Sequence, residues 1–434
     1  MTRTERYARW SAYLFPPQTF AIYGCRHLKR LKFDNSLAAL RMWGFVQNET
    51  ERLFRARQLG LKVVACLGDL GAVPVIVNSF PGVVAFYPDC LWWAPFVQES
   101  KVLFDAASEQ GIGEATCYSR AALGAFAKHA YFPDPDLCLA STGASCDDYA
   151  AVAQLAARHA RETVWIEEPM RRDAPADEPD PAAVSFLVQE YRRVVARLEE
   201  LTGHRLTEAD LHAAVARANR VRRLTARLRE LAYRHAALPA LEMMVVEFGC
   251  LHHYSDIEEW TEVLEHLLAT AERRLGAGEC AVSPDALRVV WVTPPADPLY
   301  LSHFEDSGAR IVGTEYVIGQ ALELVSETAP PLAAVAESFL AASLIGTTRR
   351  RAETVLRQVE KNDAEGIVIS GIFGGSHCAM ETRLISHYVH EAVGIPLLEF
   401  DIPDPAPEVT GQLRTRIEAF LELLAERRAG PGTW

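Results

Sequence analysis

Four of the nine cysteines stand where a thiol could act as a metal ligand or a nucleophile. Cys66 ends the apolar run LKVVAC, Cys117 and Cys146 each precede a helical pattern, and Cys378 lies between an apolar strand pattern and a helix. A thiolate at a helix N-terminus is favoured by the helix dipole, which suits both roles. The alternative is burial, since a free cysteine commonly behaves as a small apolar side chain. The first three cysteines are far apart in the sequence, so only the fold could bring them together.

The other cysteines are expected to be structural, with Cys90 at the end of YPDC as a reserve ligand; the remaining ones are Cys25, Cys138, Cys250 and Cys280. No two cysteines form Cys-x-x-Cys, so zinc ribbons, thioredoxin-like pairs and bacterial ferredoxin motifs are not indicated. GIFGG and GDLG match neither the dinucleotide fingerprint nor the P-loop, and we therefore predict no ATP site in this chain.

Two further polar groups are interpreted as structural. The adjacent His252 and His253 could bind a metal, but neighbouring side chains point in different directions on a helix or strand, which favours a structural or surface role. The basic run TTRRRAE at 347–353 is interpreted as a solvated helix face.

Strand and helix patterns alternate in two stretches of the chain. In the first, LKVVACLG, AVPVIVNSF, PGVVAFYP, DLCLAS and ETVWIEEP are expected to be strands, with YSRAALGAFAKHA and DYAAVAQLAARHA as helices. In the second, ALRVVWVTPPADP, GARIVGTEY, GIVISGIFGG and GIPLLEFDIPDP are the apolar segments. This alternation is typical of parallel sheets in α/β proteins, in which functional groups follow the carboxyl ends of strands.

The predicted organisation is an α/β fold of two doubly wound parallel-sheet domains joined by a helical segment. Residues 1–57 are expected to form an N-terminal helical arm, 58–184 the first α/β domain with the cysteines, 185–275 the helical linking region, and 276–434 the second α/β domain. Within the linking region, Thr207 and Asp210 have the spacing of a capping box.

Composition excludes several classes of protein. The 434 residues are 49% hydrophobic, and this content disfavours disorder. Their formal charge of −13 disfavours nucleic-acid binding. No uncharged apolar run of about 18 residues is present, and MTRTERYARW lacks the apolar core of a signal peptide, so we expect no membrane association and a cytoplasmic location. Disulfides are not expected in a cytoplasmic protein, because the cytoplasm keeps thiols reduced.

From about Leu61 to Asp401 the chain resembles the benzoyl-CoA reductase and 2-hydroxyacyl-CoA dehydratase family, which includes the 2-hydroxyglutaryl-CoA dehydratase D-component. The resemblance rests on the order and spacing of six segments: KVVAC with LGDLGAVPV, TCYSRAALG, PDPDLCLASTGASCDD, GHRLTEADLHAAVARANRVRRLTARLREL, RVVWVTPPADP and HEAVGIPLLEFD.

This resemblance implies that Cys66, Cys117 and Cys146 bind a [4Fe-4S] cluster, with Cys378 as a further candidate and Cys90 in reserve. Three thiolates would leave one iron free for a substrate oxygen or water, whereas four would make the cluster an electron relay. If these three are ligands, their sulfur atoms must lie within about 6 to 7 Å of one another, because the cluster is compact. Cys378 would then lie across a cleft, on the second domain.

The resemblance also implies the reaction and its partners. Members of this family pass low-potential electrons one at a time to a CoA thioester, forming a ketyl radical anion under anaerobic conditions. A separate ATP-hydrolysing iron–sulfur activator supplies the electrons, and a homologous second cluster subunit completes a homo- or heterodimer. Ser119, Ser145 and His377 lie beside cysteine positions and are candidate proton donors, although such residues are more often helix caps or loop residues.

One departure from the family pattern bears on the substrate. The family commonly has Pro-Glu-Glu or Pro-x-Glu-Leu after its first cysteine, whereas this chain passes from Cys66 through Leu67 and Leu70 into GAVPV. On that ground we expect an oxidoreductase subunit that resembles benzoyl-CoA reductase. The alternatives are a 2-hydroxyacyl-CoA dehydratase subunit, which is a lyase, a reductase of small molecules with a double-cubane [8Fe-9S] cluster, and a non-catalytic partner subunit.

Overall fold

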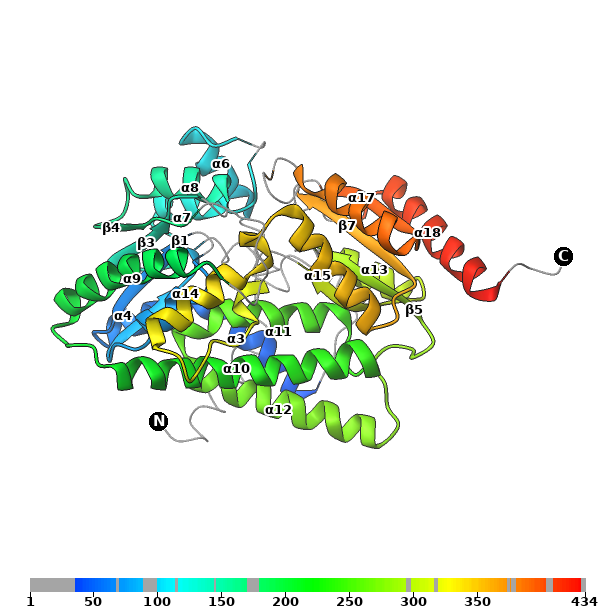
Figure 1. Cartoon of the computed structure of the whole chain (residues 1–434), viewed down its shortest axis with the longest axis horizontal. Coiled ribbons are helices and arrows are strands. Elements are labelled where there is room, and N and C mark those ends of the chain that lie inside the picture. Colours follow the sequence, from blue (N-terminus) through cyan, green and yellow to red (C-terminus); the bar gives the residue numbers. More distant parts are fainter. Residues whose placement is uncertain are drawn as a thin grey trace.

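Two four-stranded parallel sheets stand side by side above a layer of long helices (Figure 1). The computed structural model describes residues 36–67, 70–88, 100–113, 116–143, 146–169, 179–293, 298–315, 319–372, 375, 380–402 and 409–430. The expected α/β class with two doubly wound parallel sheets is confirmed. The first 35 residues of the expected N-terminal arm lie outside the described ranges.

The first sheet has the strand order β2-β1-β3-β4. Alternate residues of its central strand enter two cores: Val63, Ala65 and Leu67 pack with the helices α6 to α8, and Val64 and Cys66 face the long central helices. A strand covered on both faces needs an uninterrupted apolar run, and VVACL at positions 63–67 is such a run. The elements are β1 (Lys62–Leu67), α5 (Val73–Val77), β2 (Val83–Phe86), α6 (Ser100–Glu109), α7 (Arg120–Lys128), β3 (Leu137–Ser141), α8 (Asp147–Ala156) and β4 (Thr163–Ile166).

The second sheet has the order β6-β5-β7-β8, which repeats the arrangement of the first. In both sheets the first strand in sequence lies between the second and the third. The order in which strands are added to the sheet therefore reverses between β1 and β3, and between β5 and β7. The elements are β5 (Leu287–Val292), α13 (Pro298–Asp306), β6 (Ala309–Glu315), η3 (Gly319–Ala321), α14 (Pro331–Ala341), η4 (Ser343–Ile345), α15 (Thr348–Lys361), β7 (Gly366–Ile372), α17 (Thr382–Val393), β8 (Leu397–Ile402) and α18 (Gly411–Ala429).

The helical layer beneath the sheets is assembled from several parts of the sequence. The predicted capping box is present, since Thr207 Oγ1 accepts the N–H of Asp210 at 3.2 Å and Asp210 accepts the N–H of Thr207 at 3.0 Å. No described helix is long and apolar enough to cross a bilayer. The elements are α3 (Leu37–Gln47), α4 (Glu49–Gln58), α9 (Pro181–Thr202), α10 (Glu208–His235), α11 (Ala240–His252), η2 (His253–Ser255) and α12 (Ile257–Gly276).

Helices from outside residues 185–275 also join this layer. Helix α3 packs on α11 and α12, where the buried Arg41 guanidinium donates to Glu259 Oε1 at 2.9 Å. Helix α14, which follows the second strand of the second sheet, packs against α9 and α10 (Figure 1). The layer therefore ties both sheets together through contacts between remote parts of the sequence.

Two local expectations were wrong. The run AVPVIVNSF is the short helix α5 and not a strand, with Pro74 in its first turn, where a missing N–H costs nothing. A five-residue apolar run buried on all sides fits either structure, so its periodicity could not decide. The basic run at 347–353 is not a solvated face, because Arg350 and Arg351 are buried.

The histidine pair is structural, as expected. His252 and His253 are both buried, and His252 Nδ1 is hydrogen-bonded to the carboxylate of Glu49. Burial lowers the pKa of His253 to about 3, and the nearby charges of Arg222 and His252 act in the same direction. Its ring packs against that of Tyr254 at a tilt of 33°, with 4.0 Å between centroids. Because its pKa is lowered by burial, the imidazole is neutral in the folded protein at physiological pH.

Acidification is expected to destabilise the protein through His253. Because its pKa is near 6.5 in the unfolded chain and about 3 in the folded one, the stability it contributes is present above pH 6.5 and is lost as the pH falls toward 3. Between pH 7.5 and 5.0 this amounts to about 2 kcal/mol. In urea unfolding, the free energy of unfolding of His253→Phe should therefore fall by about 2 kcal/mol less than that of the wild type between pH 7.5 and 5.0. An unchanged pH dependence in this variant would contradict the assignment.

Candidate functional site

Cys66 lies at the carboxyl end of the central strand of the first sheet. It is the penultimate residue of β1 and stands opposite Leu139 of β3. Its side chain is fully buried on the face that meets the central helices, near Tyr254. The adjoining strand β3 ends at Ser141, from which the chain continues to Cys146. Cys66 thus lies at the end of one of the two strands that flank the switch point, and Cys146 follows the other; open α/β sheets place their ligand sites there.

Cys117 and Cys146 stand at the starts of two adjoining helices. Cys146 is the N-cap residue of α8, and Cys117 precedes α7 by three residues. The two helices pack together, and the backbone N–H of Cys117 donates to Asp148 Oδ2 in the first turn of α8 at 3.4 Å. The structure therefore places the two segments that carry these cysteines, which are remote in sequence, next to each other.

The surroundings of Cys117 oppose a free thiolate. Burial raises the pKa of the Cys117 thiol to about 11, although the backbone N–H and the hydroxyl of Ser119 both favour its deprotonated form. Asp148 raises the pKa further, and Arg120 lowers it. A neutral thiol at physiological pH is a poor nucleophile, whereas a metal ion would deprotonate it outright. These electrostatics disfavour a nucleophile at Cys117 and suit either a metal ligand or a buried neutral thiol.

The predicted sites fall partly within the described residues. Ser119 is buried at the N-cap of α7, beside Cys117. Cys90, Ser145, His377 and Cys378 lie outside the described residues. Within the part of the chain that is described, no three histidine, cysteine, aspartate or glutamate side chains are grouped as a metal site. The complete ligand set therefore stays a prediction.

A buried ion-pair cluster stands at the carboxyl edge of the second sheet. Arg351 of α15 donates from Nε and Nη2 to both carboxylate oxygens of Glu315, at 3.0 and 2.8 Å. Its Nη1 donates to Glu381 Oε2 at 2.9 Å, and Nη2 lies 3.5 Å from Thr293 Oγ1. Arg351 thus connects the ends of β5 and β6 to Glu381, the N-cap residue of α17. Sequence reasoning missed this cluster because its members are far apart along the chain.

The end of β7 is fixed to the end of β5 by a second set of hydrogen bonds. The buried Ser370 hydroxyl accepts from Trp291 Nε1 at 2.9 Å and donates to the carbonyl of Thr293. Thr293 itself has a φ of 52°, in the left-handed region, and its N–H donates to the Glu315 carbonyl at 2.6 Å. These hydrogen bonds connect the ends of β5, β6 and β7.

Two doubly wound sheets with cysteines at a carboxyl edge define an α/β protein that is suited to binding a cofactor or ligand at the strand ends. The sequence profile of the family described as "2-hydroxyglutaryl-CoA dehydratase, D-component" matches residues 72–424, which is most of the chain. The chain belongs to this family, as the ordered cysteine motifs indicated.

A curated relative is described as "Putative dehydratase subunit YjiM" of Escherichia coli (strain K12). It is 26% identical to this chain over 252 residues, which cover 56% of this chain and 65% of that protein. The aligned part thus spans slightly less than two thirds of the curated relative.

Proposed function

We propose that this chain is the iron–sulfur subunit of a dehydratase that acts on a CoA thioester. The observation that supports the proposal is the placement of Cys117 and Cys146 at the starts of two packed helices, with Cys66 near the carboxyl end of β1. Membership of the dehydratase D-component family supports the reaction and substrate class. A homologous second subunit and an ATP-hydrolysing activator belong to the same proposal.

The residues present fit a cluster in their chemistry. Thiolates are the usual ligands of iron–sulfur clusters, and N–H groups at helix starts stabilise negative charge on sulfur. Cys66, Cys117 and Cys146 would hold the cluster, which would supply low-potential electrons to the thioester. Ser119 is placed to donate its N–H and hydroxyl toward the Cys117 sulfur, and Asp148 orients the Cys117 backbone. Hydrogen bonds of this type, from residues that do not themselves bind the metal to residues that do, orient the ligands and tune a metal centre.

Dehydration is preferred to reduction of benzoyl-CoA. The shortened segment after Cys66 favours the reductase, but the matched family and the curated relative are both described as dehydratases. The two reactions differ in their electron balance, because removal of water is redox-neutral and ring reduction consumes electrons. Assays with the activator should therefore need only catalytic reductant with a 2-hydroxyacyl-CoA. Consumption of reductant in proportion to benzoyl-CoA product would instead establish the reductase.

Iron analysis tests the proposal directly. After anaerobic purification and reconstitution, about four iron and four acid-labile sulfide per chain are expected for a single [4Fe-4S] cluster. About twice that iron would indicate the double-cubane type. A protein that stays free of iron under these conditions would contradict the cluster proposal and leave a non-catalytic partner subunit as the alternative.

Removal of the Asp148 carboxylate is expected to weaken iron binding by the cluster site without removing a ligand. Asp148→Ala deletes the acceptor for the Cys117 N–H, and loss of such an outer contact typically weakens metal binding about 10-fold. Asp148→Asn keeps an acceptor oxygen and should behave nearly as wild type. The measurement is the rate of iron loss to a chelator. Asp147→Ala, in the same helical turn but exposed, is the matched control, and equal rates for both alanine variants would contradict this role.

A further inference from the structure

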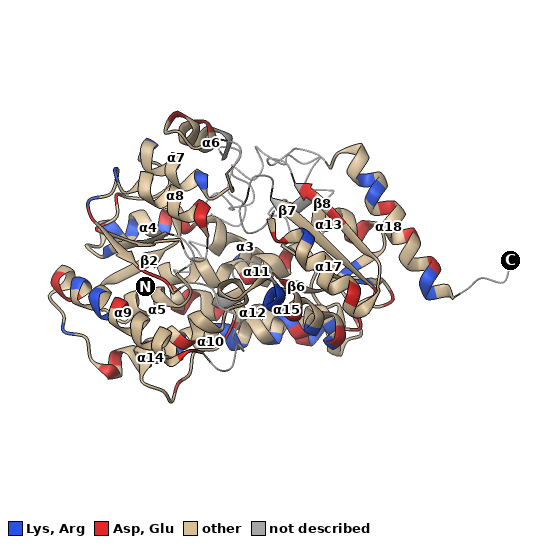
Figure 2. Ribbon diagram, turned by 45° about the horizontal axis from the view of Figure 1, so that its top comes forward, with Lys and Arg blue, Asp and Glu red and all other residues tan. Residues whose placement is uncertain are grey.

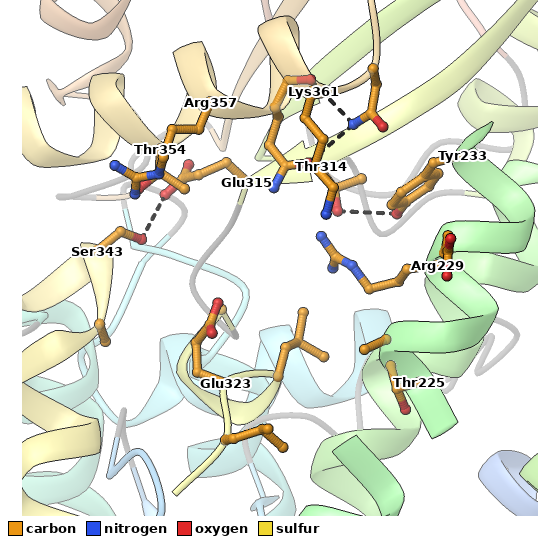
Figure 3. A pocket seen from close by; sticks show the side chains of 18 of the residues that line it. Thr225, Arg229, Tyr233, Thr314, Glu315, Glu323, Ser343, Thr354, Arg357 and Lys361 are labelled. Atoms are coloured by element: carbon orange, nitrogen blue, oxygen red, sulfur yellow. Dashed lines mark hydrogen bonds between the residues drawn. The ribbon is translucent and has the colours of Figure 1, made fainter. Parts of the chain in front are cut away.

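A polar cavity that is lined by none of the cysteines lies between the central helices and the second sheet. It encloses about 630 Å³ and is bounded by α10, the end of β6, η3, α14 and α15. Figure 3 shows side chains reaching it from α10 on one side and from α15 and η4 on the other. Its volume is in the range of sites that bind nucleotides and other small organic ligands.

One wall of the cavity is fixed by a buried hydrogen-bond network. Arg229 Nη1 donates to Glu247 Oε1 at 2.6 Å, and the Tyr233 hydroxyl donates to the same oxygen at 2.6 Å. The Thr314 hydroxyl also lies 3.2 Å from Glu247 Oε2 and 3.2 Å from the Tyr233 hydroxyl. Burial and the Glu247 charge raise the pKa of Tyr233 well above its usual value, so its hydroxyl stays protonated. The wall is therefore preorganised before any ligand arrives.

Three of the cations that line the cavity have no ion-pair partner within the described part of the chain. Arg229 is paired with Glu247, whereas Glu315 shares Arg351 with Glu381, and Glu230 shares Arg227 with Glu272. Among the described residues, the other charged lining groups form no ion pair within 4.0 Å; they are Arg234, Arg357 and Lys361 on the basic side and Glu323 on the acidic side. Basic segments on α15 are visible in Figure 2. Arg234, Arg357 and Lys361 are exposed and could pair with an anionic ligand in the cavity.

The lining also offers hydroxyls and an apolar surface. Ser338 is only 8% exposed, and its hydroxyl has no hydrogen-bond partner within the described part of the chain. A ligand could supply the hydrogen bond that this buried hydroxyl lacks. Leu322 and Leu324 line the same cavity, and Leu324 is 52% exposed although it is a large apolar side chain. The cavity thus presents cations, hydroxyls and an apolar contact together.

We propose that this cavity binds a phosphate-bearing nucleotide. Arg357 and Lys361, one turn apart on α15, together with Arg234 across the cavity, would contact the phosphate groups. The hydroxyls would bond the ribose or the remaining phosphate oxygens, and the leucines would contact the base. The nucleotide is either the adenosine phosphate end of a CoA thioester, which rests on the proposed function, or a free nucleotide.

Calorimetric titration of the full-length chain tests the site without iron or an activator. The probes are adenosine 3′,5′-bisphosphate, CoA, ADP and adenosine. At least one phosphorylated probe is expected to bind at least about 10-fold more tightly than adenosine, because a charge-assisted hydrogen bond contributes about 1.5 to 3 kcal/mol. The double variant Arg357→Met with Lys361→Met should weaken that binding about 10-fold or more. Arg349→Met, exposed on the same helix but not lining the cavity, is the matched control and should bind as wild type.

The outcomes separate the two sources of the nucleotide. Tight binding of adenosine 3′,5′-bisphosphate, displaced by CoA, assigns the cavity to the thioester, and binding of ADP that CoA does not displace assigns it to a free nucleotide. Failure of every phosphorylated probe to bind at millimolar concentration would overturn the proposal. Equal affinity in the double variant and the Arg349→Met control, or equal affinity for adenosine, would overturn it as well. None of these results bears on whether the chain holds a cluster.

Discussion

Alanine at Cys146 or at Cys117 is expected to remove most of the bound iron and to lower thioester turnover at least about 100-fold. Each substitution deletes a thiolate from a site that would have only three, so a cluster could not be held in its working geometry. The two positions share one location, since the Cys117 N–H bonds to Asp148 two residues after Cys146. Each single variant should therefore have nearly the full effect of the double variant, as measured by iron and sulfide content and by anaerobic turnover.

Buried cysteines outside the proposed site provide the control. Cys138 is completely buried in β3 on the face that packs against α7 and α8, and burial raises the pKa of its thiol to about 12. Cys250 is buried in α11, where Thr225 Oγ1 lies 3.3 Å from its sulfur. Cys138→Ala and Cys250→Ala should keep their iron and lose only a little stability. If Cys117→Ala and Cys146→Ala retain as much iron as these controls, the two cysteines are structural.

Arg351→Met is expected to lower the free energy of unfolding by about 3 to 5 kcal/mol. Arg351 is 1% exposed and is hydrogen-bonded to both Glu315 and Glu381, which are themselves buried. Removal of the guanidinium would leave two buried carboxylates without their cation, and breaking a buried pair from one side typically costs this much. Chemical denaturation at neutral pH would measure the change.

The neighbouring arginine in the same helix is the control. Arg349 is exposed and pairs with Glu353 at 3.3 Å, so Arg349→Met should change stability by less than about 0.5 kcal/mol. A second variant separates charge from packing, because Glu315→Gln combined with Arg351→Met removes one of the stranded charges and should recover part of the loss. A cost below about 1 kcal/mol for Arg351→Met would show that the cluster contributes little to stability.

The alternation of short apolar runs with amphipathic helices determined the fold class from the sequence alone. Runs such as VVACL and VVWV are apolar throughout because both faces of a parallel strand are covered, and each strand's own residues meet this requirement. The Thr207 and Asp210 capping box is equally local, since both residues lie within one helical turn. The order of the cysteine motifs also sufficed to indicate the family that the sequence profile confirms.

Only the tertiary structure decided which side chains meet. The sequence predicts that Arg351 belongs to a solvated basic run. The structure shows that it is hydrogen-bonded to Glu315 and Glu381, which are remote in sequence. From the sequence, Asp148 is only an acidic residue in the first turn of a helix, whereas in the structure it accepts a hydrogen bond from the N–H of Cys117. Periodicity reports whether a residue faces the core, but a buried charge or polar group is stable only beside its partner. Partners separated by tens of residues are chosen by the packing of whole elements, which no local pattern records.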